Sequence, residues 1–237
     1  MNHQTEKFLQ LYKELEYEGR RVYFPSAKEN ESIIGRLLCV PQLKAYKDDL
    51  DYCRVVRNFL THNPKVGGVY PIVPSQEMIH LLRHCVNVIV NPPLAIDYAI
   101  PIKKMFTVKI DSCIMETVKI MNKFTYTHVP VYDEEKLIGV FSENTVYSYM
   151  CCKNDIHISE NTTLREFIDY LPIDKHINEY FSFIPKKMLL HEAEELFKHN
   201  FENNKLLAAV YITENGRSSE PILGMLTHWD ILLSEYN

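Results

Sequence analysis

The sequence predicts an α+β protein in which an all-helical amino-terminal domain precedes two copies of a small sheet with two helices, packed as a pseudo-two-fold pair. Two observations predict this. Apolar residues recur at helical spacing over roughly the first ninety residues. Beyond residue 97 a strand-to-helix turn occurs twice, with apolar residues around a glycine leading to a Ser or Thr and then a helix. The expected domains are residues 1–96, 97–155 and 156–237.

Composition is that of a globular protein, with 46% hydrophobic and 24% charged residues. No apolar run reaches the length of a membrane span, and the first residues lack a cationic-then-apolar signal pattern, so we expect a cytoplasmic location and no membrane partner. Of 26 basic and 31 acidic residues, residues 1–93 hold 12 and 10, which leaves 14 and 21 for the remainder. An acidic carboxy-terminal part disfavours a general nucleic-acid surface there, because phosphate contacts need clustered cations.

Four helices are expected in the amino-terminal domain. The third has a regular apolar stripe and should end near His62, because Pro64 disfavours helix at the residue before it. The first has its apolar positions before Gly19. The expected helical segments are residues 8–15, 33–38, 43–62 and 75–90.

The remainder should repeat the order strand, helix, strand, strand, helix. Asp111 and Ser112 are the expected N-cap of the first of these helices, and Thr163 with Glu166 forms a predicted capping box that opens another. In the first copy the expected strands are 107–110, 128–133 and 137–141, with helices at 114–124 and 142–151. In the second copy the expected strands are 180–184, 206–213 and 222–226, with helices at 164–171, 190–201 and 228–236.

The duplicated turn carries a resemblance to a known family. It reads Gly224-Met-Leu-Thr227-His-Trp-Asp230 in the second copy, and Gly139-Val-Phe-Ser142 after the strand Val129-Pro-Val-Tyr-Asp133 in the first. Both copies resemble cystathionine-β-synthase-type (CBS) domains in the tandem arrangement called a Bateman module. The resemblance implies a regulatory site between the copies for AMP, ADP, ATP or a related adenosyl compound, with no cofactor required.

Thr227 and Asp230 are the ribose contacts that the resemblance implies, since an ionised carboxylate accepts strong hydrogen bonds from vicinal hydroxyls. In the first copy Ser142 keeps its place but Thr145 stands at the acidic position, so we expect one competent site rather than two. His128 stands where related modules often hold a basic phosphate ligand. The alternative is that Thr227 and Asp230 only cap the last helix and that His128 is structural.

A second resemblance lies in the helical domain. Arg57-Asn58 followed by His62 resembles the Arg-x4-6-His motif of HEPN domains, many of which are metal-independent ribonucleases. It implies His62 as general base on a ribose 2′-hydroxyl, with Arg57 and Asn58 stabilising the phosphate charge. An ideal helix places Arg57 and His62 about 140° apart, so their convergence needs a helix break or a second subunit. The alternative is a helix end where Arg57 pairs with Asp49 or Asp51.

Other chemistry is sparse. His80 and His84 with Glu77 lie near one helical face, but no further ligand accompanies them, and we expect no metal site. The sequence therefore favours a non-enzymatic regulatory protein that binds a nucleotide as a homodimer and couples it to a helical effector domain. The alternative is a HEPN-type ribonuclease that acts on RNA under the control of the CBS pair.

Overall fold

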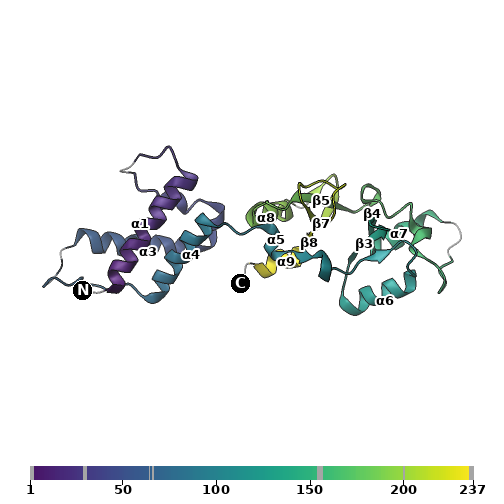
Figure 1. Ribbon diagram of the computed structural model, residues 1–237, viewed down its shortest axis with the longest axis horizontal. Helices are drawn as coiled ribbons and strands as arrows, with labels where there is room; N and C mark the ends of the chain where they lie inside the picture. The colour runs from purple at the N-terminus through teal and green to yellow at the C-terminus, as the bar shows by residue number, and fades with distance from the viewer. Residues whose placement is uncertain are drawn as a thin grey trace. The chain divides into compact units, whose positions relative to one another are not determined.

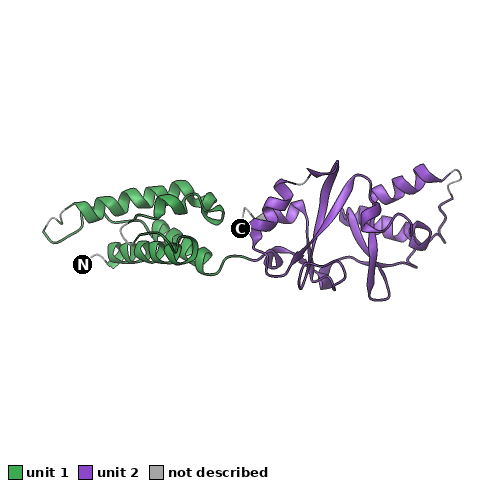
Figure 2. Ribbon diagram, turned by 90° about the horizontal axis from the view of Figure 1, so that it is seen from above, with its two compact units in different colours: residues 1–93 green, residues 94–237 purple. Residues whose placement is uncertain are grey.

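The computed structural model describes residues 3–28, 31–63, 65, 67–153, 157–199 and 201–234. They fall into two compact units, residues 1–93 and 94–237 (Figure 2). The division comes after Pro93, slightly before the expected boundary at residue 96, because the short helix after Pro93 packs within the second unit. Within these described ranges, no helix combines the length and apolar character needed to cross a bilayer.

The described part of unit 1 is helical, as the sequence predicts. Helix α3 ends at His62 as expected, although Pro64 itself lies outside the described residues. Helix α1 continues past Gly19 to Tyr23, and Leu37 packs against Gly19 so closely that an added Cβ would lie 2.6 Å from Leu37 Cδ1. The elements are α1 (His3–Tyr23), α2 (Ile34–Leu37), the 3-10 helix η1 (Pro41–Tyr46), α3 (Lys47–His62) and α4 (Gln76–Val90).

Unit 2 contains two sheets with short helices around them (Figure 1). Its elements up to residue 152 are α5 (Ala95–Tyr98), β1 (Ile100–Pro101), η2 (Ile102–Lys104), β2 (Val108–Lys109), α6 (Ile114–Phe124), β3 (His128–Asp133), β4 (Lys136–Ser142) and α7 (Glu143–Cys152). The later elements are η3 (Leu164–Phe167), η4 (Ile173–Lys175), β5 (Glu179–Pro185), α8 (Leu190–Lys198), β6 (Phe201–Glu202), β7 (Lys205–Thr213), β8 (Gly224–Leu226) and α9 (His228–Ser234). The predicted end of the last helix, at Tyr236, lies outside the described residues.

The same strand topology occurs in both sheets. In the three-stranded sheet β2 pairs parallel to β3, and β3 pairs antiparallel to β4. In the five-stranded sheet β5 pairs parallel to β7, and β7 pairs antiparallel to β8. Helix α6 connects the parallel pair of the first sheet and α8 that of the second, while α7 and α9 follow the last strands. A parallel pair needs such a crossover connection, and a helix supplies it in each sheet.

Two predicted helix caps are wrong, although α6 and η3 begin at the expected residues, Ile114 and Leu164. Asp111 does not cap α6: its carboxylate binds Arg165 at 2.7 Å, and the N-cap is Cys113. The capping box predicted at Thr163 does not form, and only the 3-10 helix η3 follows it. At Thr163 the backbone is used differently, since it bridges to Cys113, and this pairing competes with a local cap.

The segments that lead into the two sheets are exchanged. Leu94, just before α5, bridges to Leu189, just before α8 in the second half. Thr163, just before η3, bridges to Cys113, just before α6 in the first half. Accordingly Ala95 lies in the apolar core of the five-stranded sheet, while Leu164, Phe167 and Leu171 lie in that of the three-stranded sheet. Each half therefore completes its core with a segment that belongs in sequence to the other half.

This exchange of segments explains why each copy of the duplicated turn contains a glycine. We call residues 139–145 the first turn and residues 224–230 the second turn. A Cβ on Gly139 would lie 2.0 Å from the carbonyl oxygen of Leu171. A Cβ on Gly224 would lie 3.1 Å from Ala99 Cβ and 3.2 Å from the carbonyl oxygen of Ile100. In both turns the glycine lets an incoming segment approach the strand backbone.

Replacing Gly139 with alanine is expected to lower the free energy of unfolding by about 3 kcal/mol, the upper end of the usual cost of overpacking, because a backbone segment must move. Gly224→Ala is the matched control and should cost about 1 kcal/mol, since its neighbours need give only slightly. Urea unfolding followed by circular dichroism measures both. A Gly139→Ala protein as stable as the wild type would contradict the close approach of Leu171 to β4.

Candidate functional site

The second turn holds its acidic residue in a local hydrogen-bond pattern. Asp230 Oδ2 accepts from the backbone N–H of Thr227 at 2.7 Å and from the Thr227 hydroxyl at 2.7 Å. Asp230 is half-buried, and among the residues that the structure describes its Oδ1 accepts no hydrogen bond. The neighbouring Trp229 is 75% exposed. The turn thus both caps α9 and leaves one carboxylate oxygen available to a ligand hydroxyl.

The first turn repeats the local pattern with a different outcome. Thr145 Oγ1 accepts from the backbone N–H of Ser142 at 3.0 Å, as Asp230 does from Thr227 in the second turn. The Ser142 hydroxyl, however, donates to a carboxylate from another strand, Glu179 Oε1, at 2.6 Å. Both Ser142 and Thr145 are 1% exposed. The side chain at the acidic position decides this difference, because Thr145 offers no carboxylate to the serine hydroxyl.

Glu179, at the start of β5, is the centre of a buried polar cluster. Its Oε1 accepts from Ser142 Oγ at 2.6 Å and contacts His176 Nδ1 at 2.7 Å. Its Oε2 accepts from Asn144 Nδ2 at 2.8 Å and contacts His128 Nε2 at 3.0 Å. We call Ser142, Asn144, His128 and His176 with Glu179 the Glu179 cluster. Three of its members come from β3, β4 and α7, so the cluster joins the two halves of unit 2.

The carboxylate of Glu179 is ionised in this environment. Burial by itself would raise the pKa of Glu179, but the hydrogen bonds with His128, His176 and Ser142 outweigh it and hold the pKa far below its usual range. The Phe181 ring meets the rings of His128 and His176 edge-on, with centroids 5.6 and 5.1 Å away. A buried carboxylate needs hydrogen-bond partners of this kind, because an unpaired buried charge is strongly destabilising.

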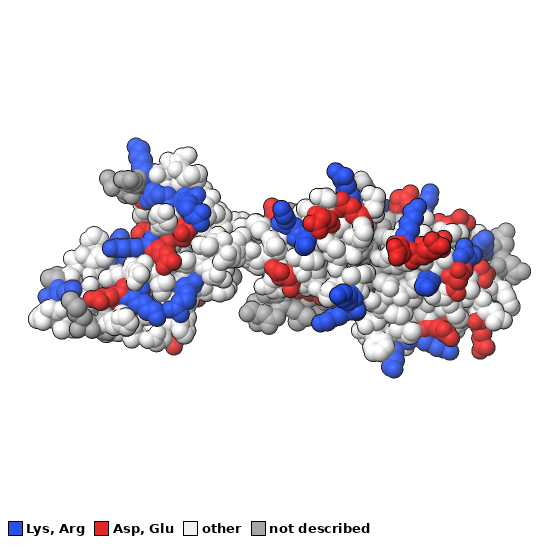
Figure 3. All heavy atoms as spheres, in the orientation of Figure 1, with Lys and Arg blue, Asp and Glu red and all other residues white. Residues whose placement is uncertain are grey.

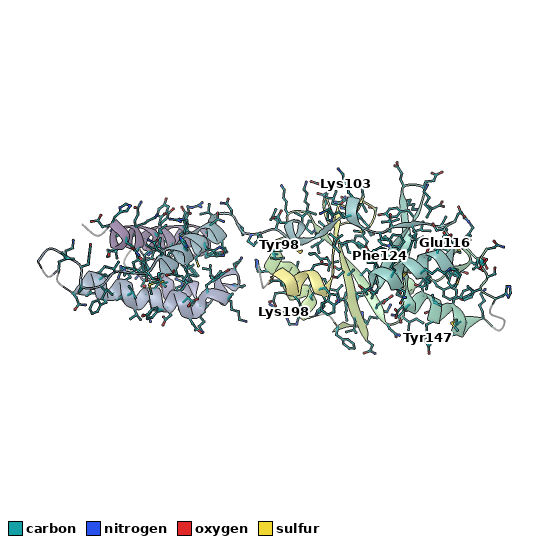
Figure 4. All side chains as sticks on the ribbon, turned by 90° about the horizontal axis from the view of Figure 1, so that it is seen from below. Tyr98, Lys103, Glu116, Phe124, Tyr147 and Lys198 are labelled. Carbon is teal, nitrogen blue, oxygen red and sulfur yellow. The ribbon has the colours of Figure 1, made fainter. Side chains whose placement is uncertain are left out.

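A cavity of about 670 Å³ lies beside the first turn, between α6 and α7. Its lining is mostly apolar and includes Met121, Tyr126 and Phe141, with Ser142 at one end. Apolar side chains on these two helices are exposed around it: Met115, Val118, Phe124, Tyr147 and Met150. Of these, Phe124 at the end of α6 and Tyr147 on α7 can be followed in Figure 4. Exposed apolar side chains beside an apolar cavity are typical of an interaction surface.

Charge gives no sign of a nucleic-acid surface on the face of the molecule shown in Figure 3. Over unit 2, acidic and basic side chains lie interspersed on that face rather than gathered by sign. A phosphate backbone needs clustered cations, so this face does not favour one.

The residues predicted for ribonuclease chemistry are not brought together in one chain. Arg57 Nη1 donates to Asn58 Oδ1 at 3.1 Å, and its guanidinium lies 5.4 Å from the Tyr12 ring centroid. Helix α3 continues through His62, so Arg57 and His62 leave it on faces about 140° apart. The alternative ion pair of Arg57 with Asp51 does not form either, because Asp51 binds Arg54 at 2.8 Å.

The histidines of α4 do not form a metal centre within the described ranges. No group of three His, Cys, Asp or Glu side chains there is placed to hold an ion. His84 Nε2 contacts the hydroxyl of Tyr46 at 2.9 Å.

Sequence reasoning missed Glu179, Asn144 and His176. Asn144 sits inside the first turn, between two residues of interest, and spacing within the turn was the signal that could have found it. Glu179 opens a strand that is otherwise largely apolar, and a carboxylate there has no periodic signature. Its role depends on contacts with residues 35 to 51 positions away in sequence, which local patterns do not reveal.

Comparison with known proteins identifies one family. Residues 96–152 match the family model of the CBS domain, which spans α5 to α7 and the first turn. The match thus covers the first of the two predicted copies and well under half of the chain. A search of the curated proteins found no match.

Solved structures similar to this chain include several with CBS domains. CBSX2 in complex with AMP is 13% identical, with a TM-score of 0.42, and covers 61% of this chain and 96% of its own. A hemolysin-like protein containing a CBS domain, from Oenococcus oeni, is 16% identical with a TM-score of 0.40, covering 62% and 93%. The CBS domain of a bacterial CNNM/CorC family Mg²⁺ transporter in complex with ATP is 17% identical with a TM-score of 0.40, covering 61% and 87%.

The ionised state of Glu179 predicts how stability depends on pH. In the unfolded chain Glu179 takes up a proton near pH 4.3, roughly its ordinary pKa, whereas in the folded protein it stays ionised to lower pH. The unfolded state then binds more protons, so the free energy of unfolding should fall as the pH drops from about 5 to 3.

Glu179→Gln should make that fall shallower and should cost about 2 kcal/mol at pH 7, the usual value of a hydrogen bond to a charged group. Urea titrations of both proteins at pH 7, 5 and 4 measure the two effects. Parallel curves of stability against pH would show that Glu179 is not the group responsible.

Proposed function

We propose that unit 2 is a tandem pair of CBS domains that binds an adenosine-containing ligand, and that the protein is a cytoplasmic regulator in which this ligand acts on the helical unit 1. We call residues 97–155 the first repeat and residues 156–237 the second repeat. The CBS family match to residues 96–152 supports the first repeat. The identical strand pairing in the five-stranded sheet supports the second.

Asp230 is the observation that carries the ligand proposal. Its carboxylate lies at a strand-to-helix turn, with Oδ2 engaged by Thr227 and Oδ1 open among the described residues. A half-buried carboxylate fixed in this way accepts a ribose hydroxyl without first losing its own orientation, which reduces the entropic cost of binding. Thr227 positions Asp230 through its hydroxyl and its N–H. The cap and the ligand contact are therefore compatible, because they use different oxygens of one carboxylate.

The cavity and exposed apolar side chains between α6 and α7 support a homodimer. Tyr147 is 65% exposed, Phe124 52% and Met150 47%. A second copy of the same surface is the occupant we propose, because a two-fold axis lets one apolar patch cover itself. Light scattering after size exclusion should give twice the chain mass of 27.9 kDa for the wild type and the single chain mass for Tyr147→Glu. A monomeric wild type would rule the dimer out.

Ligand binding is expected to stabilise the protein in a way that depends on the charge of Asp230. AMP, ADP, ATP and S-adenosylmethionine are the ligands to screen by thermal shift, and one at 100 times its dissociation constant adds about 2.7 kcal/mol. Trp229 is the only tryptophan of the chain and follows Thr227 by two residues, so its fluorescence offers a second readout. Asp230→Asn keeps an acceptor for the Thr227 N–H but loses the charge, and should weaken affinity at least about tenfold, or 1.4 kcal/mol.

The control is Asp174→Asn, which removes an exposed carboxylate in the same repeat and should bind as the wild type does. No shift with any of the four ligands, or an undiminished shift in Asp230→Asn, would remove Asp230 as the binding residue.

A second candidate function is the ribonuclease implied by the HEPN resemblance. The hydrogen bond between Arg57 and Asn58 places a guanidinium and an amide side by side, as phosphate stabilisation requires. Since His62 leaves α3 on another face, the proposal needs His62 from a second subunit.

Under this proposal the wild type should cleave single-stranded RNA in EDTA. His62→Ala should cleave at least about 100-fold more slowly, because a general base usually contributes that much to the rate. His80→Ala, which changes an exposed histidine, should cleave at the wild-type rate. Gel electrophoresis with and without each nucleotide measures cleavage. Intact RNA under every condition would leave unit 1 without a catalytic role.

A further inference from the structure

The Glu179 carboxylate uses all of its hydrogen-bonding capacity. An ionised carboxylate has about four acceptor positions. Glu179 meets four partners, two on each oxygen, at distances of 2.6 to 3.0 Å. The residue is 6% exposed. Glu179 therefore has no lone pair left for a ligand hydroxyl, and it differs in this respect from Asp230, whose Oδ1 is open among the described residues.

The groups around Glu179 form a receptor for an anion. His128 Nε2, Ser142 Oγ and Asn144 Nδ2 come from the start of β3, the end of β4 and the start of α7, and all three meet the same carboxylate. We call these three side chains the first-repeat cradle. His128 and Ser142 are the residues for which the sequence predicted an external ligand. In the structure an anion does lie between them, but it is a side chain of the protein.

The two turns explain why the carboxylate comes from elsewhere. In the second turn the Thr227 hydroxyl is taken up by Asp230 of the same turn. In the first turn Thr145 Oγ1 accepts the Ser142 N–H at 3.0 Å and lies 3.4 Å from Ser142 Oγ, while the Ser142 hydroxyl donates to Glu179 at 2.6 Å. Asn144 adds an amide donor at the place where Trp229 stands in the second turn. The first turn thus offers donors but has Thr145 instead of an acid at the position of Asp230, and this favours an anion from outside the turn.

We propose that the first repeat contains a binding cradle for a small oxyanion, a carboxylate or a phosphate, which Glu179 of the second repeat fills in place of an external ligand. The filled cradle closes the first repeat to nucleotide, so the pair takes one nucleotide at Asp230 rather than two. The statement about stoichiometry rests on the proposed function; the cradle itself does not.

Removing the Glu179 side chain tests the cradle by chemical rescue. Glu179→Ala removes Cγ and the carboxyl group, and leaves a space that matches acetate. Sodium acetate should raise the Tm of Glu179→Ala saturably, by about 3 °C or more, which corresponds to the usual effect of a bound ligand on a domain of this size. Sodium chloride at equal ionic strength controls for salt. Sodium phosphate in a parallel arm shows which oxyanion the cradle prefers.

Three comparison proteins make the rescue specific. The wild type should not respond to acetate, because Glu179 occupies the cradle. Glu179→Gln should not respond, because the amide fills the same space. Glu220→Ala, which removes a half-buried carboxylate that binds Asn215, should not respond either. An acetate response in any of the three equal to that of Glu179→Ala would overturn the proposal.

Folding of Glu179→Ala is itself part of the test. If the variant is unfolded in chloride, acetate must restore its circular dichroism spectrum, and a variant that stays unfolded in saturating acetate counts against the cradle. If it folds and shows no saturable rise in Tm, the cradle does not bind free anions and the proposal fails.

Equilibrium dialysis of the wild type with AMP tests the stoichiometry separately. One AMP per chain is expected, and two would show that Glu179 does not close the first repeat. Rescue by acetate together with no AMP bound would refute the proposed nucleotide function while leaving the cradle intact.

Discussion

The exchange of leading segments between the two halves of unit 2 is the constraint on which the rest of the structure depends. The Val140 N–H donates to the carbonyl of Leu171, and the Ile102 N–H donates to the carbonyl of Leu223. Backbone groups that would otherwise be buried without partners are satisfied only when both halves are in place. Because each core contains side chains from the other half's leading segment, neither sheet is a complete folding unit alone.

The Glu179 cluster lies where the two halves of unit 2 meet, and burying it costs free energy but fixes how the halves pack. Placing the Glu179 carboxylate among buried groups is unfavourable until every acceptor position is filled, and the positions are filled only by partners from both halves. The surrounding contacts between the halves are apolar, and Val140 packs in one cluster with Phe181 and Tyr211. Apolar contacts tolerate displacement, whereas four directed hydrogen bonds fix one register. The cluster therefore specifies how the two sheets meet more than it adds to their stability.

The sequence predicts the elements well where the signal is local. The apolar runs of β3 and β7, the apolar stripe of α3 and the helical segment of α4 are all local patterns, and the structure has these elements near the expected positions. Prediction from the sequence fails where the backbone of a residue pairs with a segment that is distant in the chain. Thr163 has a good capping sequence, yet its backbone pairs with Cys113, fifty residues earlier in the chain.

The candidate site shows the same difference between local contacts, which the sequence reveals, and distant contacts, which it does not. Thr227 and Asp230 could be found from the sequence because their hydrogen bonds lie within one turn of four residues. His128 and Ser142 were found by position, but their partner was not, because Glu179 is 51 residues from the first and 37 from the second. A single sequence shows which donors a turn offers, and only the packed fold shows which acceptor reaches them.

Paired strands of the five-stranded sheet also connect the two turns. Glu179 is the first residue of β5 and pairs with Leu206 of β7, and β7 in turn pairs with β8 through Val210 and Leu226. Leu226 directly precedes Thr227. Glu179 on β5 and the strand β8 that leads into Asp230 therefore belong to one sheet and are joined through β7 by backbone hydrogen bonds. If a ligand binds Asp230 as proposed, it would contact the helix that follows β8, in a sheet whose edge strand β5 is held by the Glu179 cluster.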